Sequence, residues 1–367
     1  MRPPGTFFLP GPTEVRPEVL AAMQQPMMAH RTPEFEALFA RLQEGLRELF
    51  GTRRPVFIAG CSGTGMMEAA VRCARPGRVL SLVNGAFSSR FAEIARRCAR
   101  EVDVIEAPPG ATVPLDVVRQ QLRSERYSAL TVVHSETSTG ALTDLRTIGE
   151  LAREHEVLSL VDSVSGVGGA PMACDAWELD LVLSASQKAI ALPAGLAFAV
   201  VSERYMEHVA SAPARGMYLD LMQFAEFARR NQTPTTPPLS LLRALERQLD
   251  LIAADGGVPA RWERHADMAR ITWEWGDSLR EAIHPDLGCL AHSGARSPTV
   301  TAITLPVGLL ADRVVRAVEA RGFIIGGGNG PTRDSVIRVG HMGDHTPSGV
   351  AACLDAVSDA LRGLLSR

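Results

Sequence analysis

The chain has 367 residues, of which 46% are hydrophobic and 22% charged, with a formal net charge of −3 at pH 7. These proportions are those of an ordinary globular protein, and the scattered arginines form no basic patch of the kind that binds nucleic acid or membrane surfaces. The length exceeds that of one simple core and favours two domains.

The six cysteines (Cys61, Cys73, Cys98, Cys174, Cys289 and Cys353) are widely spaced and include no Cys-x-x-Cys pair. This spacing predicts neither a metal site nor a disulfide framework. The N-terminus lacks a signal-peptide pattern and no apolar run reaches membrane-spanning length, so we expect a cytoplasmic protein.

From residue 55 to residue 185, short apolar runs alternate with helical patterns. The apolar runs are 55–60, 78–85, 102–107, 129–135, 157–163 and 179–185, and helical patterns at 65–74, 88–99, 115–124 and 144–156 separate the first five. This alternation predicts an α/β fold with a mostly parallel sheet covered on both faces. Ligands of such sheets bind beyond the carboxyl ends of the strands.

The pattern changes at the Thr/Pro-rich stretch 231–240, whose prolines exclude a helix before Leu239. A long amphipathic helix is expected over 239–254. Beyond it we expect a compact α+β domain, made of a helix at 259–283, a strand at 299–306, a helix at 310–322, a strand at 335–340 and a last helix from Ser348. The predicted division is an N-terminal arm (1–16), a large domain (17–256) and a small C-terminal domain (257–367).

Lys188, within "LVLSASQKAIALPAG", is the only lysine of the chain. A drift toward arginine would remove lysines wherever the two are interchangeable, but it would spare a nucleophilic amine, because guanidinium stays protonated. Strongly apolar sequence surrounds Lys188, and burial lowers the pKa of a lysine. Lys188 is therefore either a nucleophile or a lysine that was kept by chance.

Polar residues follow three of the predicted strands. "AGCSGTG" (59–65) contains small residues and hydroxyls that suit either a phosphate or a plain tight turn. Asp162 ends a buried strand, where it is either the partner of a cation or a cap for the next segment. The cluster 134–139 (His-Ser-Glu-Thr-Ser-Thr) suits loop capping as well as function.

Together these features supply a phosphate anchor, an acid, hydroxyl groups and a buried lysine. Pyridoxal phosphate (PLP) needs these parts: an anchor for its phosphate, an acid beside its pyridine nitrogen, a hydrogen-bond partner for its ring hydroxyl and a lysine for its aldehyde. The combination indicates a PLP enzyme and requires no metal.

Six motifs along the chain resemble those of the class V aminotransferases, which are fold type I PLP enzymes, and most closely the alanine/serine–glyoxylate (or pyruvate) aminotransferases. They are "FLPGPTEV", "SGTG…EAA", "ETSTG", "DSVSGVGG", "SASQKAIALPAGLAF" and "VIRVGHMG". The resemblance covers nearly the entire chain. It implies a large domain with a mostly parallel seven-stranded sheet, a smaller C-terminal α+β domain, and a homodimer with shared active sites.

The resemblance also assigns residues. Lys188 would bind the cofactor covalently and Asp162 would hold its pyridine nitrogen; these two are the catalytic residues. The remaining cofactor contacts would come from Ser62, Gly63, Thr64, Phe87, Thr137, Gln187 and, from the partner subunit, Thr236. Arg338 would bind the substrate α-carboxylate, with Gly11 of the Pro-Gly-Pro segment also on the substrate side.

The sequence departs from the family pattern at two positions. Phe87 stands where close relatives often stack a tryptophan on the cofactor ring. Thr233 stands where the family has a tyrosine that reaches the partner subunit, so that function is lost or supplied elsewhere.

The predicted activity is ping-pong transfer of an amino group from alanine or serine to glyoxylate or pyruvate. Acidic donors are expected to be poor, because no second arginine stands in a motif position for a side-chain carboxylate. Alternatives are a 2-aminoethylphosphonate–pyruvate aminotransferase, a cysteine desulfurase-like lyase, and a non-catalytic protein that has kept the fold. The desulfurase lacks support because the loop "GGGNGPTRD" contains no cysteine.

Overall fold

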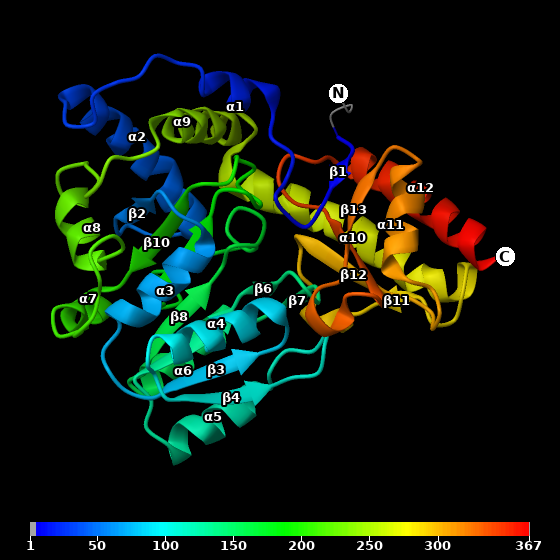
Figure 1. Cartoon of the computed structure of the whole chain (residues 1–367), viewed down its shortest axis with the longest axis horizontal. Helices are drawn as coiled ribbons and strands as arrows, with labels where there is room; N and C mark the ends of the chain where they lie inside the picture. The colour runs from blue at the N-terminus through cyan, green and yellow to red at the C-terminus, as the bar shows by residue number, and fades with distance from the viewer. Residues whose placement is uncertain (1–4, 367) are drawn as a thin grey trace.

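A computed structural model describes residues 5–366 and shows two main sheets with helices packed around them (Figure 1). The larger sheet has seven strands, in the spatial order β2 (Val56–Ala59), β10 (Ala197–Val201), β9 (Leu181–Ala185), β8 (Leu158–Asp162), β5 (Ala129–Val133), β3 (Val79–Val83) and β4 (Val102–Glu106). Neighbouring strands from β9 to β4 run parallel, whereas β10 is antiparallel to both of its neighbours. The predicted mostly parallel, seven-stranded α/β sheet is therefore confirmed.

Helices cover both faces of this sheet. Because side chains alternate along a strand, the apolar residues of the sheet divide between two buried clusters. The first cluster is completed by α1 (Pro17–Ala22), α2 (Pro33–Phe50), α5 (Leu115–Ser124), α6 (Leu145–Glu154) and α9 (Leu239–Ala254). The second is completed by α3 (Gly63–Cys73), α4 (Ala86–Arg97), α7 (Glu203–Val209) and α8 (Leu221–Ala228).

Strand β8 shows how this alternation orients a polar group. Leu158 and Leu160 belong to the cluster under α3 and α4, and Val161 belongs to the opposite cluster. Asp162 follows in phase with Leu160, so its carboxylate emerges on the side of α3 and α4 at the carboxyl end of the strand.

The second sheet has the order β1 (Phe7–Phe8), β13 (Ile324–Gly327), β14 (Val336–Gly340), β12 (Val300–Thr304) and β11 (Gly288–Cys289). The helices α10 (Gly257–Ala282), α11 (Ala311–Glu319) and α12 (Pro347–Leu365) pack with it around a third apolar cluster. A short hairpin of β6 (Ser135–Glu136) and β7 (Ala141–Leu142) lies between the two sheets (Figure 1).

Strand β1 pairs in parallel with β13, which ties the N-terminal arm to the C-terminal sheet. Strand pairing of two residues leaves no periodic signal, and the sequence did not predict it. The helix expected at 239–254 is found with those bounds, and the helix expected at 259–283 begins two residues earlier, at Gly257. Helix α2 was not predicted, although Pro33 occupies its first turn, where proline is well tolerated.

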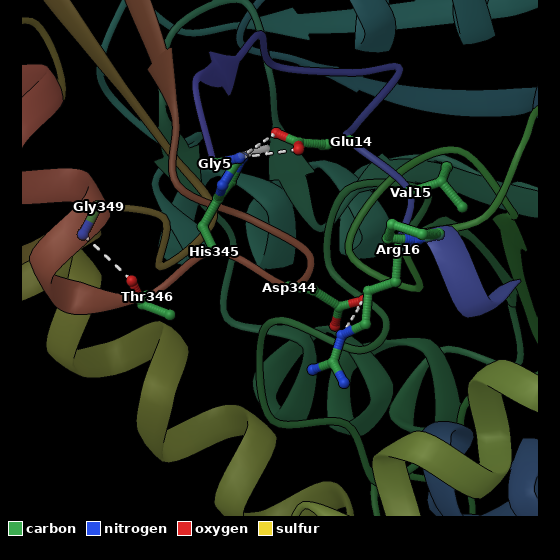
Figure 2. A pocket seen from close by; sticks show the side chains of 9 residues that line it. Gly5, Glu14, Val15, Arg16, Asp344, His345, Thr346 and Gly349 are labelled. Carbon is green, nitrogen blue, oxygen red and sulfur yellow. Dashed lines mark hydrogen bonds and ion pairs between the residues drawn. The ribbon is translucent and has the colours of Figure 1, made fainter. Parts of the chain in front are cut away.

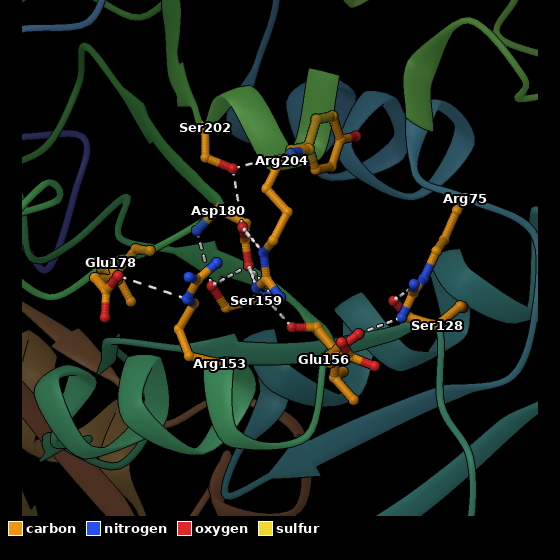
Figure 3. Close-up of polar contacts among 12 residues, drawn as sticks. Arg75, Ser128, Arg153, Glu156, Ser159, Glu178, Asp180, Ser202 and Arg204 are labelled. Atoms are coloured by element: carbon orange, nitrogen blue, oxygen red, sulfur yellow. Dashed lines mark hydrogen bonds and ion pairs between the residues drawn. The ribbon is translucent and has the colours of Figure 1, made fainter. Parts of the chain in front are cut away.

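The buried carboxylate of Asp180 joins several elements at the end of the large sheet where the parallel strands begin (Figure 3). Asp180 accepts hydrogen bonds from Ser159 N at 2.9 Å and from Ser202 Oγ at 2.9 Å, and it forms an ion pair with Arg204. These contacts join the start of β8, the start of β9 and the start of α7. Within residues 5–366 no helix has the length and apolar character to cross a bilayer.

Candidate active site

A cavity of about 90 Å³ lies where the carboxyl ends of β5 and β8 meet the N-termini of α3 and α4. It brings together eight residues singled out from the sequence, which are Ser62, Gly63, Thr64, Phe87, Thr137, Asp162, Gln187 and Lys188. Its lining also includes Met67, Arg90, Val133, Ser135, Val164 and Ser165. The strand ends therefore converge as the α/β pattern requires.

The loop before α3 forms a cradle for an anion. Ser62 caps the helix by accepting a hydrogen bond from Gly65 N at 3.4 Å, and the hydroxyl-bearing residues Ser62 and Thr64 are exposed. A Cβ on Gly63 would lie 2.7 Å from Val164 Cγ2, so a larger residue would displace its neighbour. Helix N-termini with free N–H groups and hydroxyls bind phosphate, so this loop has the groups that an anion site needs.

Asp162 is 3% exposed, and its Oδ1 accepts a hydrogen bond from Val164 N at 2.8 Å. Burial raises the pKa of Asp162 to about 7, against the hydrogen bond from Val164; the charge of Glu136 adds to the increase, while Lys188 and Arg90 reduce it. Among residues 5–366 no cation forms an ion pair with this carboxylate. A protonated ring nitrogen placed in the cavity would supply the missing partner.

Lys188 is 7% exposed, and its amine donates a hydrogen bond to the carbonyl of Pro10. Burial and the charge of Arg338 lower the pKa of Lys188 to about 8, against Asp162 and Glu136. The amine is thus partly neutral, and therefore nucleophilic, near physiological pH. A Cβ on Gly11, whose φ is +94°, would lie 2.5 Å from Lys188 Nζ, so a larger residue at 11 would obstruct the amine.

Arg338 reaches the site from the C-terminal sheet. Its neighbours Ile337 and Val339 are fully buried, so Arg338 points to the opposite face of β14. Its Nε donates to Gly327 O at 2.7 Å and its Nη1 to Thr137 O at 3.1 Å. Among residues 5–366 the other three N–H groups of Arg338 donate to no acceptor, so its outer edge can hold a carboxylate in two hydrogen bonds.

Comparison with known proteins places this geometry in a family. The sequence model described as "Aminotransferase class-V" matches residues 6–308. The chain is a class V aminotransferase. It uses pyridoxal 5′-phosphate, and the anion cradle, the buried Asp162 and the buried amine of Lys188 fit that cofactor.

Three relatives illustrate the similarity. The L-aspartate–glyoxylate aminotransferase of Paracoccus denitrificans is 32% identical over 369 residues, which covers 96% of this chain and 91% of that protein. The serine–glyoxylate aminotransferase of Methylorubrum extorquens is 32% identical over 354 residues, covering 92% and 86%. The crystal structure of an alanine–glyoxylate aminotransferase from Nostoc sp. superposes with a TM-score of 0.90 at 32% identity, covering 99% and 97% of the two chains.

Two polar residues of the cavity lining, Ser165 and Arg90, were missed by the sequence reasoning. Ser165 lies within "DSVSG", and its hydroxyl is 2.6 Å from Thr137 Oγ1. Arg90 lies one helical turn beyond Phe87, and its guanidinium carbon is 5.0 Å from the centroid of that ring. The spacing of three residues on a helix was the available signal for Arg90. Glu136 is fully buried between the cavity and α4.

Thr236 does not line the cavity of its own chain; it is exposed. Thr233 is buried and donates through Oγ1 to Thr235 O at 2.8 Å, so it faces its own subunit. Beside this segment, Tyr218 donates to Gly60 O at 3.0 Å, just before the anion cradle. Met217 and Tyr218 are 81% and 54% exposed.

A second cavity, of about 160 Å³, lies between the N-terminal arm and the start of α12 (Figure 2). It contains none of the predicted site residues. Its Arg16 Nε lies 3.2 Å from Asp344 Oδ2, and Arg261 holds the other oxygen of Asp344 at 2.8 Å. Arg261 also donates to Ala189 O at 3.2 Å, so this cluster supports the turn that carries Lys188. No group of three or more metal-ligating side chains occurs in the described range 5–366.

Asp162→Asn should make the cofactor-free protein more stable at pH 8. The folded pKa of about 7 lies above the ordinary 3.8, so between these values the folded state binds more protons and stability falls as pH rises. The gain should reach on the order of a few kcal/mol above pH 7, at about 1.4 kcal/mol per pKa unit, and vanish near pH 4.

Urea unfolding at pH 5 and pH 8 measures this difference. Asp180→Asn is the matched control, because Asp180 already has Arg204 as its partner and its replacement should destabilise the protein. Equal or lower stability of Asp162→Asn at pH 8 would contradict the account of Asp162 as an unpaired buried charge.

Proposed function

We propose that the protein transfers the amino group of alanine or serine to glyoxylate or pyruvate by a ping-pong mechanism. The observation that carries the proposal is the placement of the only lysine, buried, in one cavity with an unpaired buried carboxylate and the N-terminus of α3. In this proposal Lys188 and Asp162 are the catalytic residues. The cofactor is held by Ser62, Gly63, Thr64, Phe87, Thr137, Gln187 and the partner subunit's Thr236.

Each of these residues has a defined task. Bound pyridoxal phosphate withdraws electrons from the α-carbon of the amino acid and makes its proton acidic. Asp162 keeps the pyridine nitrogen protonated, because its buried carboxylate is stabilised by a cation at that position. The amine of Lys188, with a pKa of about 8, takes the α-proton and later returns it, as general base and acid.

Arg338 orients the substrate. Its outer N–H edge is free to bind one carboxylate, while Gly327 O and Thr137 O hold its position. Gly11 leaves room beside Lys188 Nζ for the amino acid. A small donor with a single carboxylate matches this set of contacts.

Acidic amino donors were expected to be poor because the sequence showed no second arginine for their side-chain carboxylate. The position of Arg90 weakens that expectation. Arg90 lines the cavity, whereas Arg338 contacts the lining residue Thr137 from outside it. The charge of Arg90 acts on Asp162. A relative of similar identity is named for transfer from L-aspartate. Aspartate is therefore the second candidate donor, with Arg90 as the group that would receive its side-chain carboxylate.

The lyase alternative requires a reactive thiolate. Burial raises the pKa of all six cysteine thiols, to about 11 for Cys61, which lies nearest to the cradle along the chain. None of the six is therefore a thiolate at neutral pH, which argues against desulfurase chemistry. For 2-aminoethylphosphonate, the phosphonate would place a doubly charged group where Arg338 is proposed to bind a singly charged carboxylate.

Borohydride treatment of the yellow holoenzyme should attach the cofactor irreversibly to the peptide that contains Lys188. The chain offers no other side-chain amine, so peptide mass spectrometry has one candidate besides the N-terminus. Lys188→Arg, which keeps the charge, should show no attachment. If only the N-terminus were labelled, Lys188 would be excluded as the residue that binds the cofactor covalently.

Steady-state kinetics should favour alanine and serine over aspartate and 2-aminoethylphosphonate. Arg338→Lys should raise KM for the amino donor, since an ammonium group cannot reproduce the planar fork. Arg90→Gln should reduce activity with aspartate more than activity with alanine, because it removes the group proposed to receive the side-chain carboxylate of aspartate. A preference for aspartate or aminoethylphosphonate above about tenfold, or roughly 1.4 kcal/mol in transition-state binding, would reject the alanine/serine assignment.

A homodimer with shared sites is also part of the proposal, supported by the exposure of Met217, Tyr218 and Thr236 beside the anion cradle. Mixing Lys188→Ala subunits with Thr236→Val subunits should then give hybrid dimers in which one site binds the cofactor as tightly as the wild-type site does. Thr236→Val alone should weaken cofactor binding by several-fold, for one lost hydrogen bond. A fully active monomer in sedimentation and activity assays would rule the shared site out.

A further inference from the structure

Glu136 is a buried carboxylate that makes an unusual number of hydrogen bonds. One oxygen accepts from Ser138 N at 3.1 Å and from Ser138 Oγ at 2.5 Å. The other accepts from Phe87 N at 3.1 Å, Ser88 N at 2.9 Å and Ser88 Oγ at 3.0 Å. The side chain therefore joins the loop after β5 to the first turn of α4.

Helix α4 has no cap of its own. Its N-cap residue is Gly85, which has no side chain, so the first N–H groups of the helix need partners from elsewhere. Glu136 satisfies Phe87 N and Ser88 N, and Ser138 Oγ accepts from Ala86 N at 2.9 Å. A Cβ at position 85 would overlap Ser138 Oγ and Glu136 Cγ, which accounts for the glycine.

Phe87 is the aromatic residue of the cavity lining. Its ring centroid lies 5.9 Å from Lys188 Nζ, and the guanidinium of Arg90 stacks on the same ring at 5.0 Å. Because Phe87 is the second residue of α4, the position of its ring follows the position of the helix start. Whatever fixes that start also fixes the ring.

The loop that carries Glu136 also contacts two further residues of the site, one within the loop and one on β14. Thr137 lines the cavity, and its carbonyl accepts from Arg338 Nη1. The charge of Glu136 also acts on Arg338, Lys188 and Asp162. The loop and the helix start are thus one unit, with Glu136 at its centre.

We propose that Glu136 is a positioning residue that caps α4 from the neighbouring loop and thereby holds Phe87 in place against the cofactor ring. The inference rests on the proposed function only in assigning Phe87 to the ring. Glu136 itself is saturated by backbone and serine donors and does not need to touch the cofactor.

The experiment measures the dissociation constant of pyridoxal phosphate from the holoenzyme and the visible circular dichroism of the bound cofactor. Glu136→Gln places an amide donor against backbone N–H groups, whichever way the amide turns. Ser138→Ala weakens the same cap but keeps the charge of Glu136. Each variant is made in the wild-type and in the Phe87→Leu background, and Asp180→Asn is the control for a buried, hydrogen-bonded carboxylate far from the ring.

Glu136→Gln should raise the dissociation constant roughly tenfold, the size expected for losing a helix cap, and should weaken the dichroic band. Ser138→Ala should do the same to a smaller extent. In the Phe87→Leu background, Glu136→Gln should add less than about twofold, because the two residues act through one ring. Asp180→Asn should lower the melting temperature and leave the dissociation constant unchanged.

Equal effects of Glu136→Gln in both backgrounds would overturn the proposal, since they would show an action that does not pass through Phe87. An unchanged dissociation constant in both Glu136→Gln and Ser138→Ala would overturn it as well. No amino donor is present in these measurements, so an error in the assigned donor cannot alter their outcome.

Discussion

The carboxylate of Asp162 leaves the end of a buried strand with one backbone N–H as its hydrogen-bond donor, and its pKa rises to about 7 as a result. Folding the chain to this state costs free energy that a fully paired carboxylate such as Asp180 avoids. The cost is recovered only when a cation occupies the cavity. The buried carboxylate of Asp162 is thus a group that a cation in the cavity would stabilise.

The arrangement of the other site residues follows from the direction of the strands. Parallel strands bring Asp162 and the loop after β5 to one edge, and the N-termini of α3 and α4 open onto the same edge. The N-terminus of α4 meets the carboxylate of Glu136, whereas among the described residues no carboxylate accepts from the first N–H groups of α3. The N-terminus of α3 therefore keeps the capacity to bind an anion that the N-terminus of α4 has already used.

Sequence reasoning located the parts of the site that are contained in one strand end or one turn. Asp162, the cradle at 62–64, Gln187 and Lys188 each stand where an apolar run stops, and all of them line the cavity. It could not assign the polar cluster 134–139, where capping and function remained open alternatives. In the structure Glu136 and Ser138 cap α4 and Thr137 lines the cavity. These positions depend on a helix that begins some fifty residues earlier, which the local sequence does not reveal.

Long-range contacts explain the remaining gaps. The strand β1 has two residues and carries no pattern, yet it anchors the arm whose Pro10 carbonyl meets Lys188. Arg261 looks like any other arginine of an arginine-rich chain, but it is buried and bridges Asp344 to the backbone of Ala189. Through Arg338 on one side and Arg261 on the other, the C-terminal part of the chain contacts both the loop after β5 and the turn that carries Lys188. A shift of that part relative to the large sheet would therefore disturb the contact of Arg338 with Thr137 and the contact of Arg261 with Ala189 at the same time.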